Sequence, residues 1–201
     1  MTDGLAKILL KAEELFLLNG VRNTTMDDLA TALGISKKTL YLSVSNKEDL
    51  VYKAFEYHME QEKSFVTEIC QNSANAIDEM FEIGKLVTRH VRNMNPTVIY
   101  DVKKYYPEAW ALLDEYKNTF IYAHILENIK KGIKQGYYRG DFNPDIIAKL
   151  YSAKADCVVD QQLFPFTDYT IISIYNEYLR YHIRGISSEK GLKYMEQLKT
   201  I

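Results

Sequence analysis

Cysteine is scarce in this 201-residue chain, which contains only Cys70 and Cys157. The two lie far apart, and neither has a second Cys or a His nearby at the spacing of metal ligands. The sequence therefore predicts neither a disulfide framework nor a zinc site. We expect both thiols to be ordinary buried or half-buried side chains, and we expect no metal and no cofactor.

Long apolar runs are also missing. No stretch of about 18 uncharged apolar residues occurs, and residues 1–19 carry several charges without a small-residue cleavage site. We therefore expect a cytoplasmic protein with no membrane partner. The net charge of −2 argues against indiscriminate coating of nucleic acid, so binding of that kind would need a local patch.

Catalytic signatures are absent as well. The sequence has no HExxH, no GxSxG and no glycine-rich phosphate loop, and its histidines are scattered, with no pair at i, i+4. The four are His58, His90, His124 and His182. We therefore expect that the chain is not an enzyme.

Strand-like alternation is lacking, whereas apolar residues recur at spacings of three and four nearly throughout. This pattern predicts an all-α protein of about nine helices, and 47% apolar residues are ample for its core. Three of the four prolines lie at expected helix starts, where a missing amide costs nothing. The expected helices cover about residues 3–18, 25–33, 36–41, 46–70, 73–92, 96–105, 107–135, 144–164 and 168–184, with a short tail helix over 187–199.

Residues 25–44 have the spacing of a helix-turn-helix. Thr25 and Asp28 form an expected capping box, and Gly34 permits the bend between the two helices. Ser36 caps the second helix, and Ser45 with Glu48 forms a further expected box at the start of the fourth. The side chains expected to face outward are Lys37, Lys38, Thr39, Leu42 and Ser43.

The stretch TTMDDLATALGISKKTLYLSVSNKEDL, residues 24–50, resembles the TetR-type (TetR/AcrR) family of bacterial transcriptional regulators. That family usually has His or Tyr where this chain has Ser43, and Phe where it has Val44. The first difference removes a phosphate or base contact, and the second thins the packing between the third and fourth helices. Farther on, IKKGIKQGYYRGDFNPDIIAKL, residues 129–150, is similar to the family's transition between two large regulatory helices.

The resemblance implies a helix-turn-helix domain over residues 1–50 and a ligand-binding and dimerisation domain over 51–201, linked by a shared helix at about 46–70. It implies a DNA-binding transcriptional regulator, a repressor that a small apolar or aromatic effector releases from a palindromic operator. An alternative stays open because of Ser43 and Val44: a helical interaction module that retains the helix-turn-helix scaffold without specific operator binding.

Three groups of residues follow from this interpretation. Thr39 and Leu42 are the expected base readers, Leu42 through a thymine methyl, and positive charges and hydroxyl groups nearby suit phosphate. The full expected DNA-contacting set is Thr25, Ser36, Lys37, Lys38, Thr39, Tyr41, Leu42, Ser43 and Lys47. Two interpretations stay open for a second group, which is mainly aromatic: its side chains surround an effector, or they fill the core. The group is Tyr100, Trp110, Phe120, Tyr122 and His124, with Asn128 beside them. Excess apolar surface on two late helices predicts a homodimer through Ile147, Leu150, Tyr151, Val158, Ile171, Tyr175, Tyr178 and Leu179.

Overall fold

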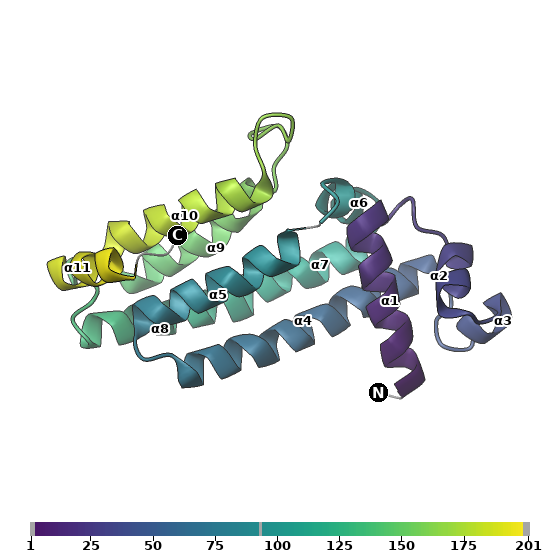
Figure 1. Cartoon of the computed structure of the whole chain (residues 1–201), viewed down its shortest axis with the longest axis horizontal. Coiled ribbons are helices and arrows are strands. Elements are labelled where there is room, and N and C mark those ends of the chain that lie inside the picture. The colour runs from purple at the N-terminus through teal and green to yellow at the C-terminus, as the bar shows by residue number, and fades with distance from the viewer. Residues whose placement is uncertain (1–2, 93, 199–201) are drawn as a thin grey trace. The chain divides into compact units, whose positions relative to one another are not determined.

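The computed structural model describes residues 3–92 and 94–198, and it is all-α over these residues, as the sequence predicts (Figure 1). The only β-type pairing among them is an isolated bridge between Tyr138 and Ser187. The elements are α1 (Asp3–Asn19), α2 (Met26–Leu33), α3 (Lys37–Leu40), α4 (Lys47–Asn72), α5 (Ala76–Val91), α6 (Thr97–Tyr105), α7 (Pro107–Tyr116), a π-helical segment (Lys117–Ile121), α8 (Tyr122–Lys134), α9 (Pro144–Val158), α10 (Ile171–Ile186) and α11 (Glu189–Gln197).

Several boundaries differ from the expected ones. The helix expected over 107–135 contains the π-helical segment, and such segments usually interrupt an α-helix for a single turn. The helix expected over 144–164 ends at Val158, and the next starts at Ile171, where Thr170 and Ser173 form a capping box. The π-helical segment divides the helix expected over 107–135 into α7 and α8, and α11 lies where the tail helix was expected.

The chain divides into two compact units. The first unit contains described residues 3–63 and 94–115, and the second contains 64–92 and 116–198. This division differs from the expected boundary at residue 50, because α6 and most of α7 group with α1, α2 and α3. The long helix α4 contributes residues to both units.

The first unit has one continuous apolar core. The stripe on α1 meets the buried side chains of the helix-turn-helix, and Val98 and Val102, one turn apart on α6, close the same core. Leu40 and Val44 are both buried, so the short α3 is fixed from its inner side. The fully buried core members are Leu9, Ala12, Phe16, Val21, Leu29, Leu40, Val44, Leu50, Val51, Ala54, Val98, Val102 and Ala109.

In the second unit α5 packs against α8 and α10, and α9 packs against the same two helices. Two glycines set the turn after α8. A Cβ on Gly132 would lie 2.0 Å from Cδ2 of Tyr138, so only Gly lets this ring pack against the helix. Gly136 has a φ of +74°, the left-handed conformation that ends the helix. Asn143 then caps α9 by accepting from the amides of Asp145 and Ile146.

Candidate nucleic-acid interface

The turn between α2 and α3 is fixed by local hydrogen bonds, as its sequence predicts. Thr25 Oγ1 accepts from the Asp28 amide at 3.1 Å, and the Asp28 carboxylate accepts from the Thr25 amide at 2.8 Å. That backbone hydrogen bond holds the pKa of Asp28 below its usual value. Gly34 follows α2 with a φ of +65°, and its amide closes the helix. The capping box and the glycine bend therefore fix how α3 leaves α2.

The helix α3 presents most of its side chains to solvent. Ser36 Oγ accepts from the Thr39 amide at 3.0 Å and caps the helix. Buried Leu40 points inward, which leaves Lys38 and Thr39 exposed. Lys37 is also exposed, and its amine pairs with Asp27 at 2.7 Å, which raises the pKa of Lys37. The outward side of α3 thus has the cations and hydroxyl that phosphate and base edges require.

The residues after α3 do not all face outward. Leu42 is 81% exposed and Tyr41 is 46% exposed, so both side chains face solvent. Ser43 is partly exposed, and its backbone carbonyl accepts from the Lys53 amine at 3.3 Å. Its place on the outer face stays a prediction. Val44 is buried and packs in the core despite being smaller than the usual Phe.

The start of α4 also differs from the expected arrangement. Asn46, not Ser45, accepts from an amide of the first turn, that of Asp49 at 2.8 Å. Ser45 donates both its amide and its hydroxyl to the Asp49 carboxylate, and no hydrogen bond links it to Glu48. The predicted box of Ser45 with Glu48 was therefore wrong: Asn46 accepts from the first turn, and Asp49 takes the Ser45 amide that Glu48 was expected to accept.

Lys47 has intramolecular partners. Its amine donates to the Arg22 carbonyl at 2.8 Å and lies 6.0 Å from the centre of the Tyr106 ring. Partial burial lowers the pKa of Lys47. A phosphate contact by this side chain would therefore replace or share the bond to Arg22.

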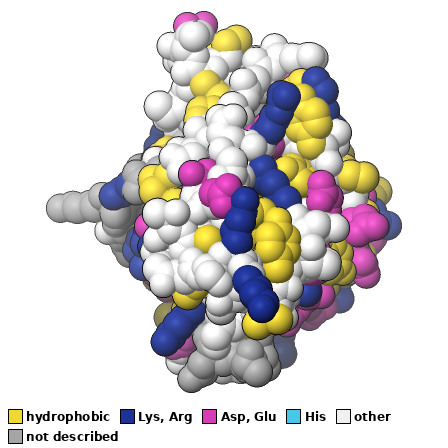
Figure 2. All heavy atoms as spheres, turned by 90° about the vertical axis from the view of Figure 1, so that its right-hand side faces the viewer, with side chains coloured by type: hydrophobic (Ala, Val, Ile, Leu, Met, Phe, Trp, Pro, Cys, Tyr) yellow, Lys and Arg dark blue, Asp and Glu magenta, His cyan; other side chains and the backbone are white. Residues whose placement is uncertain are grey.

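The surface at the α2 and α3 end carries a column of Lys and Arg side chains, with hydrophobic side chains between them (Figure 2). Acidic side chains lie on both sides of this column, with the larger group on one side. Although the whole chain has a net charge of −2, this face therefore presents a column of cations suited to a duplex backbone.

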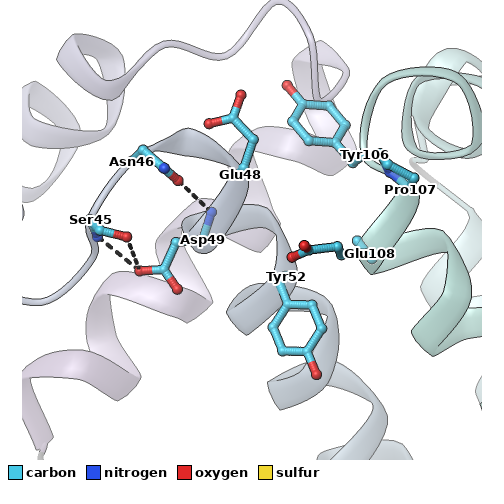
Figure 3. A pocket seen from close by; sticks show the side chains of 9 residues that line it. Ser45, Asn46, Glu48, Asp49, Tyr52, Tyr106, Pro107 and Glu108 are labelled. Atoms are coloured by element: carbon cyan, nitrogen blue, oxygen red, sulfur yellow. Dashed lines mark hydrogen bonds between the residues drawn. The ribbon is translucent and has the colours of Figure 1, made fainter.

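A hollow of about 450 Å³ lies between the starts of α4 and α7, within the first unit (Figure 3). Glu48 and Glu108 border it, and each lies in the first turn of its helix. A carboxylate is favoured there by the positive end of the helix dipole. The acidic character of this hollow is therefore explained by the two helix starts. Its lining residues are Ser45, Asn46, Glu48, Asp49, Tyr52, Tyr106, Pro107, Glu108 and Ala109.

The six residues expected around an effector do not belong to one unit. Tyr100 and Trp110 lie in the first unit, where Tyr100 is 53% exposed and Trp110 packs against the core. In the second unit the His124 ring meets Phe120 edge-on at 4.3 Å. His124 Nδ1 lies 3.7 Å from Cys70 Sγ, and burial lowers the pKa of His124.

The two remaining residues have structural partners. Tyr122 donates to Asp145 of α9 at 2.5 Å. Asn128 is buried, donates to the Ala76 carbonyl and to Glu79, and accepts from the Tyr138 hydroxyl. Its amide nitrogen thus joins α8 to α5, and its amide oxygen holds Tyr138 in the turn after α8.

The cysteines agree only in part with expectation. Cys70 is half-buried, and burial together with the charge of Glu79 raises the pKa of its thiol to about 11. It is therefore protonated at neutral pH and poorly nucleophilic. Cys157 is exposed on α9, where a buried or half-buried thiol was expected. Over residues 3–92 and 94–198, no group of side chains could hold a metal ion, and no helix is long and apolar enough to cross a membrane.

The expected interface residues on α9 and α10 are mostly internal. Within the single chain the buried ones are Tyr151, Val158, Ile171, Tyr175 and Leu179, whereas Ile147 and Tyr178 are half-buried and Leu150 is exposed. The large apolar side chains that do face solvent here are Ile146, Leu150, Leu163, Tyr169 and Tyr181. Several of them border an apolar hollow of about 610 Å³. These exposures describe a single chain, so the dimer interface stays a prediction.

Comparison with known proteins agrees with the geometry of the helix-turn-helix. Residues 8–54 match the model of the family "Bacterial regulatory proteins, tetR family". An uncharacterized HTH-type transcriptional regulator of Bacillus subtilis (strain 168), YvaF, is 30% identical over 139 residues, which are 69% of this chain and 72% of the relative. The chain belongs to the tetR family.

Solved structures share the fold of this tetR-family chain. A putative transcriptional regulator from Saccharomonospora viridis, in complex with choline, has a TM-score of 0.75 and 19% identity, covering 94% of this chain and 100% of that one. Reduced NemR of E. coli has a TM-score of 0.75 and 15% identity, covering 93% and 98%. The protein is thus a DNA-binding transcriptional regulator, in agreement with the expectation that it is not an enzyme.

Proposed function

We propose that this regulator represses transcription as a homodimer bound to a palindromic operator, and that a small apolar or aromatic effector releases it. The observation that supports operator reading is the exposure of Leu42, 81%, directly after a helix held in place by buried Leu40. An apolar side chain in this position gains from contact with a thymine methyl group in the major groove.

The residues around Leu42 complete the proposed contact. Thr39 is exposed on α3 and reads a base edge, while Lys38 and Tyr41 hold phosphates on either side. Ser36, Lys37 and the capped start of α2 at Thr25 lie on the same short stretch and supply further polar contacts. Ser43, partly exposed after α3, is a further proposed contact. The arrangement favours insertion of α3 in the major groove.

Dimerisation is supported by the apolar side chains that α9 and α10 leave exposed. Ile146 and Leu150 lie one turn apart on α9, and Tyr181 of α10 is 71% exposed. A second copy would cover them through an isologous interface, in which the same patch is used twice. Two copies related by a two-fold axis suit a palindromic operator, since each half-site then meets the same helix.

Effector binding is supported by the edge-on contact between Phe120 and His124 in the second unit, with Cys70 beside His124. A structural neighbour from Saccharomonospora viridis was crystallised in complex with choline. An effector acts only if it binds one state of the regulator better than the other. A coupling of about 1–3 kcal/mol would lower operator affinity roughly 5- to 150-fold.

The operator contact is tested by fluorescence anisotropy with duplex from the protein's own promoter region. We expect Leu42→Ala to weaken binding by about 1–2 kcal/mol, roughly 5- to 30-fold, and to relax the preference for thymine at one position. The salt dependence should not change, because no charge is removed. Leu192→Ala, which truncates an exposed leucine of α11, is the matched control and should bind as the parent does.

Equal affinity of the parent protein for the promoter duplex and for a scrambled duplex would contradict operator recognition. That result would favour the interaction module that keeps the helix-turn-helix as a scaffold. Specific binding that Leu42→Ala leaves intact would instead contradict only the base-reading role of Leu42.

A further inference from the structure

The outer side of α6 carries positive charges outside the helix-turn-helix. Lys103 and Lys104 are exposed in the last turn of α6, and Arg22 reaches this turn from the connection between α1 and α2. Together with the neighbouring rings of Tyr100 and Tyr105, these residues are called the α6 basic patch. All five belong to the first unit, which also contains the helix-turn-helix.

Aromatic rings hold the cations of this patch. Lys104 Nζ lies 5.2 Å from the centre of the Tyr100 ring and 5.3 Å from that of Tyr105, and it donates to the Tyr100 hydroxyl at 2.7 Å. The Arg22 guanidinium lies 4.9 Å above the Tyr105 ring and donates to its hydroxyl at 3.2 Å. Lys103 lies over the Trp110 ring at 5.2 Å. These contacts restrict the side chains while leaving N–H groups for another partner.

No carboxylate neutralises the patch. Within residues 3–92 and 94–198, Arg22, Lys103 and Lys104 form no ion pair. Asp101, the acidic residue of α6, is buried and accepts from the Arg22 amide at 3.0 Å, on the inner side of the helix.

Some lysines on other helices are paired with a glutamate three residues away, as in Lys63 with Glu60 and Lys85 with Glu82. The helix dipole favours lysines at the end of α6. It does not account for Arg22, which lies outside that helix. The patch therefore presents net positive charge.

The patch is continuous with the proposed DNA-contacting residues. Lys47, the first residue of α4, donates to the carbonyl of Arg22, while the Arg22 side chain lies on Tyr105. The α1–α2 connection is further fixed to α6 through the bond between the Arg22 amide and Asp101. A chain of direct contacts therefore leads from the start of α4 to Lys104, and the column of cations in Figure 2 follows this end of the molecule.

We propose that the α6 basic patch binds backbone phosphates of the duplex that flanks the half-site read by α3. Lys and Arg bind phosphate oxygens without reading sequence, so the patch adds affinity and fixes register. The proposal rests on the proposed function, since it requires a chain already docked on an operator. It extends the contact with DNA to a helix outside the helix-turn-helix.

The test uses the full chain and two promoter duplexes with the same palindrome. One ends at the palindrome, and the other continues for about ten base pairs, one helical turn, on each side. The variant is Lys103→Ala with Lys104→Ala. The control, Lys130→Ala with Lys134→Ala, removes the same charge from exposed positions on α8 of the second unit. Circular dichroism checks that both variants fold as the parent does.

On the long duplex, we expect the plot of log affinity against log salt to become less steep by about 1.8 for each chain bound. The ratio of the parent's affinity to the variant's affinity should therefore fall about twelvefold per chain as the salt rises from 50 to 200 mM. On the short duplex the two proteins should bind alike, and the α8 control should match the parent on both.

Equal salt slopes for parent and variant on the long duplex would overturn the patch while leaving operator binding intact. A loss that is the same on both duplexes would also overturn it, because the flanking phosphates would then have no part in the effect. Failure of the parent protein to bind either duplex would remove the proposed function, and this proposal with it.

Discussion

Lys131→Met should destabilise the second unit by leaving a buried carboxylate without its cation. Glu79 of α5 is only 4% exposed, and its Oε2 lies 2.6 Å from Lys131 Nζ of α8. Its Oε1 accepts from Asn128 at 2.9 Å. After the substitution only neutral groups, the Asn128 amide and the Cys70 thiol, would contact the negative charge, while methionine keeps most of the aliphatic stem.

The expected loss follows from the burial of the two partners. Removal of one member of a buried ion pair costs about 3–5 kcal/mol, because the other charge is left unpaired in a poorly solvated place. The Lys131 side chain is about one-third exposed, so water can replace part of its contact with Glu79. We therefore expect a loss of about 2–3 kcal/mol, equivalent to a fall in Tm of about 4–12 °C for a chain of this size.

Thermal and urea unfolding at pH 7, followed by circular dichroism, measure this loss. The double variant Glu79→Gln with Lys131→Met should recover much of the stability, because a neutral amide still accepts from Asn128. Lys130→Met is the matched control, since Lys130 pairs with exposed Glu127 and its removal should cost under about 0.5 kcal/mol. A stability of Lys131→Met within about 0.5 kcal/mol of the parent, or a double variant no more stable than the single one, would refute the reasoning.

Two further substitutions test the first unit. Lys47→Met should reduce the salt slope of operator binding by about one per chain, because one phosphate contact is removed. Loss of its hydrogen bond to the Arg22 carbonyl should also lower the free energy of unfolding by about 1 kcal/mol. An altered base preference with an unchanged slope would contradict a phosphate role. Burial by itself lowers the pKa of His58. The hydrogen bond to Glu13 at 2.7 Å and the charges of Glu13 and Glu62 have the opposite and larger effect, so the pKa of His58 is raised above 6.5. The resulting stabilisation is full below pH 6.5 and is lost as the pH rises through the raised pKa, so Tm should fall more between pH 6 and pH 8 in the parent than in His58→Gln.

The sequence alone determined the features that depend on residues close together in the chain. Spacings of three and four specified helices, and Thr25 with Asp28, Ser36 with Thr39 and Gly34 specified the helix-turn-helix. These caps and bends join residues at most four positions apart, so their geometry follows from local hydrogen bonds and from allowed backbone angles. The exposure of Leu42 followed in the same way, because buried Leu40 fixes which side of α3 faces inward.

Only the tertiary structure decided what each helix faces. Leu179 of α10 is buried within its own chain, whereas Leu150 of α9 is exposed, and the apolar pattern of two such helices cannot tell the side covered by one chain from the side left for another. Asn128 is committed to α5, and Lys47 to Arg22, through partners 25 or more positions away. Side-chain contacts of that range arise from packing between helices, and periodicity within one helix carries no information about its distant neighbours.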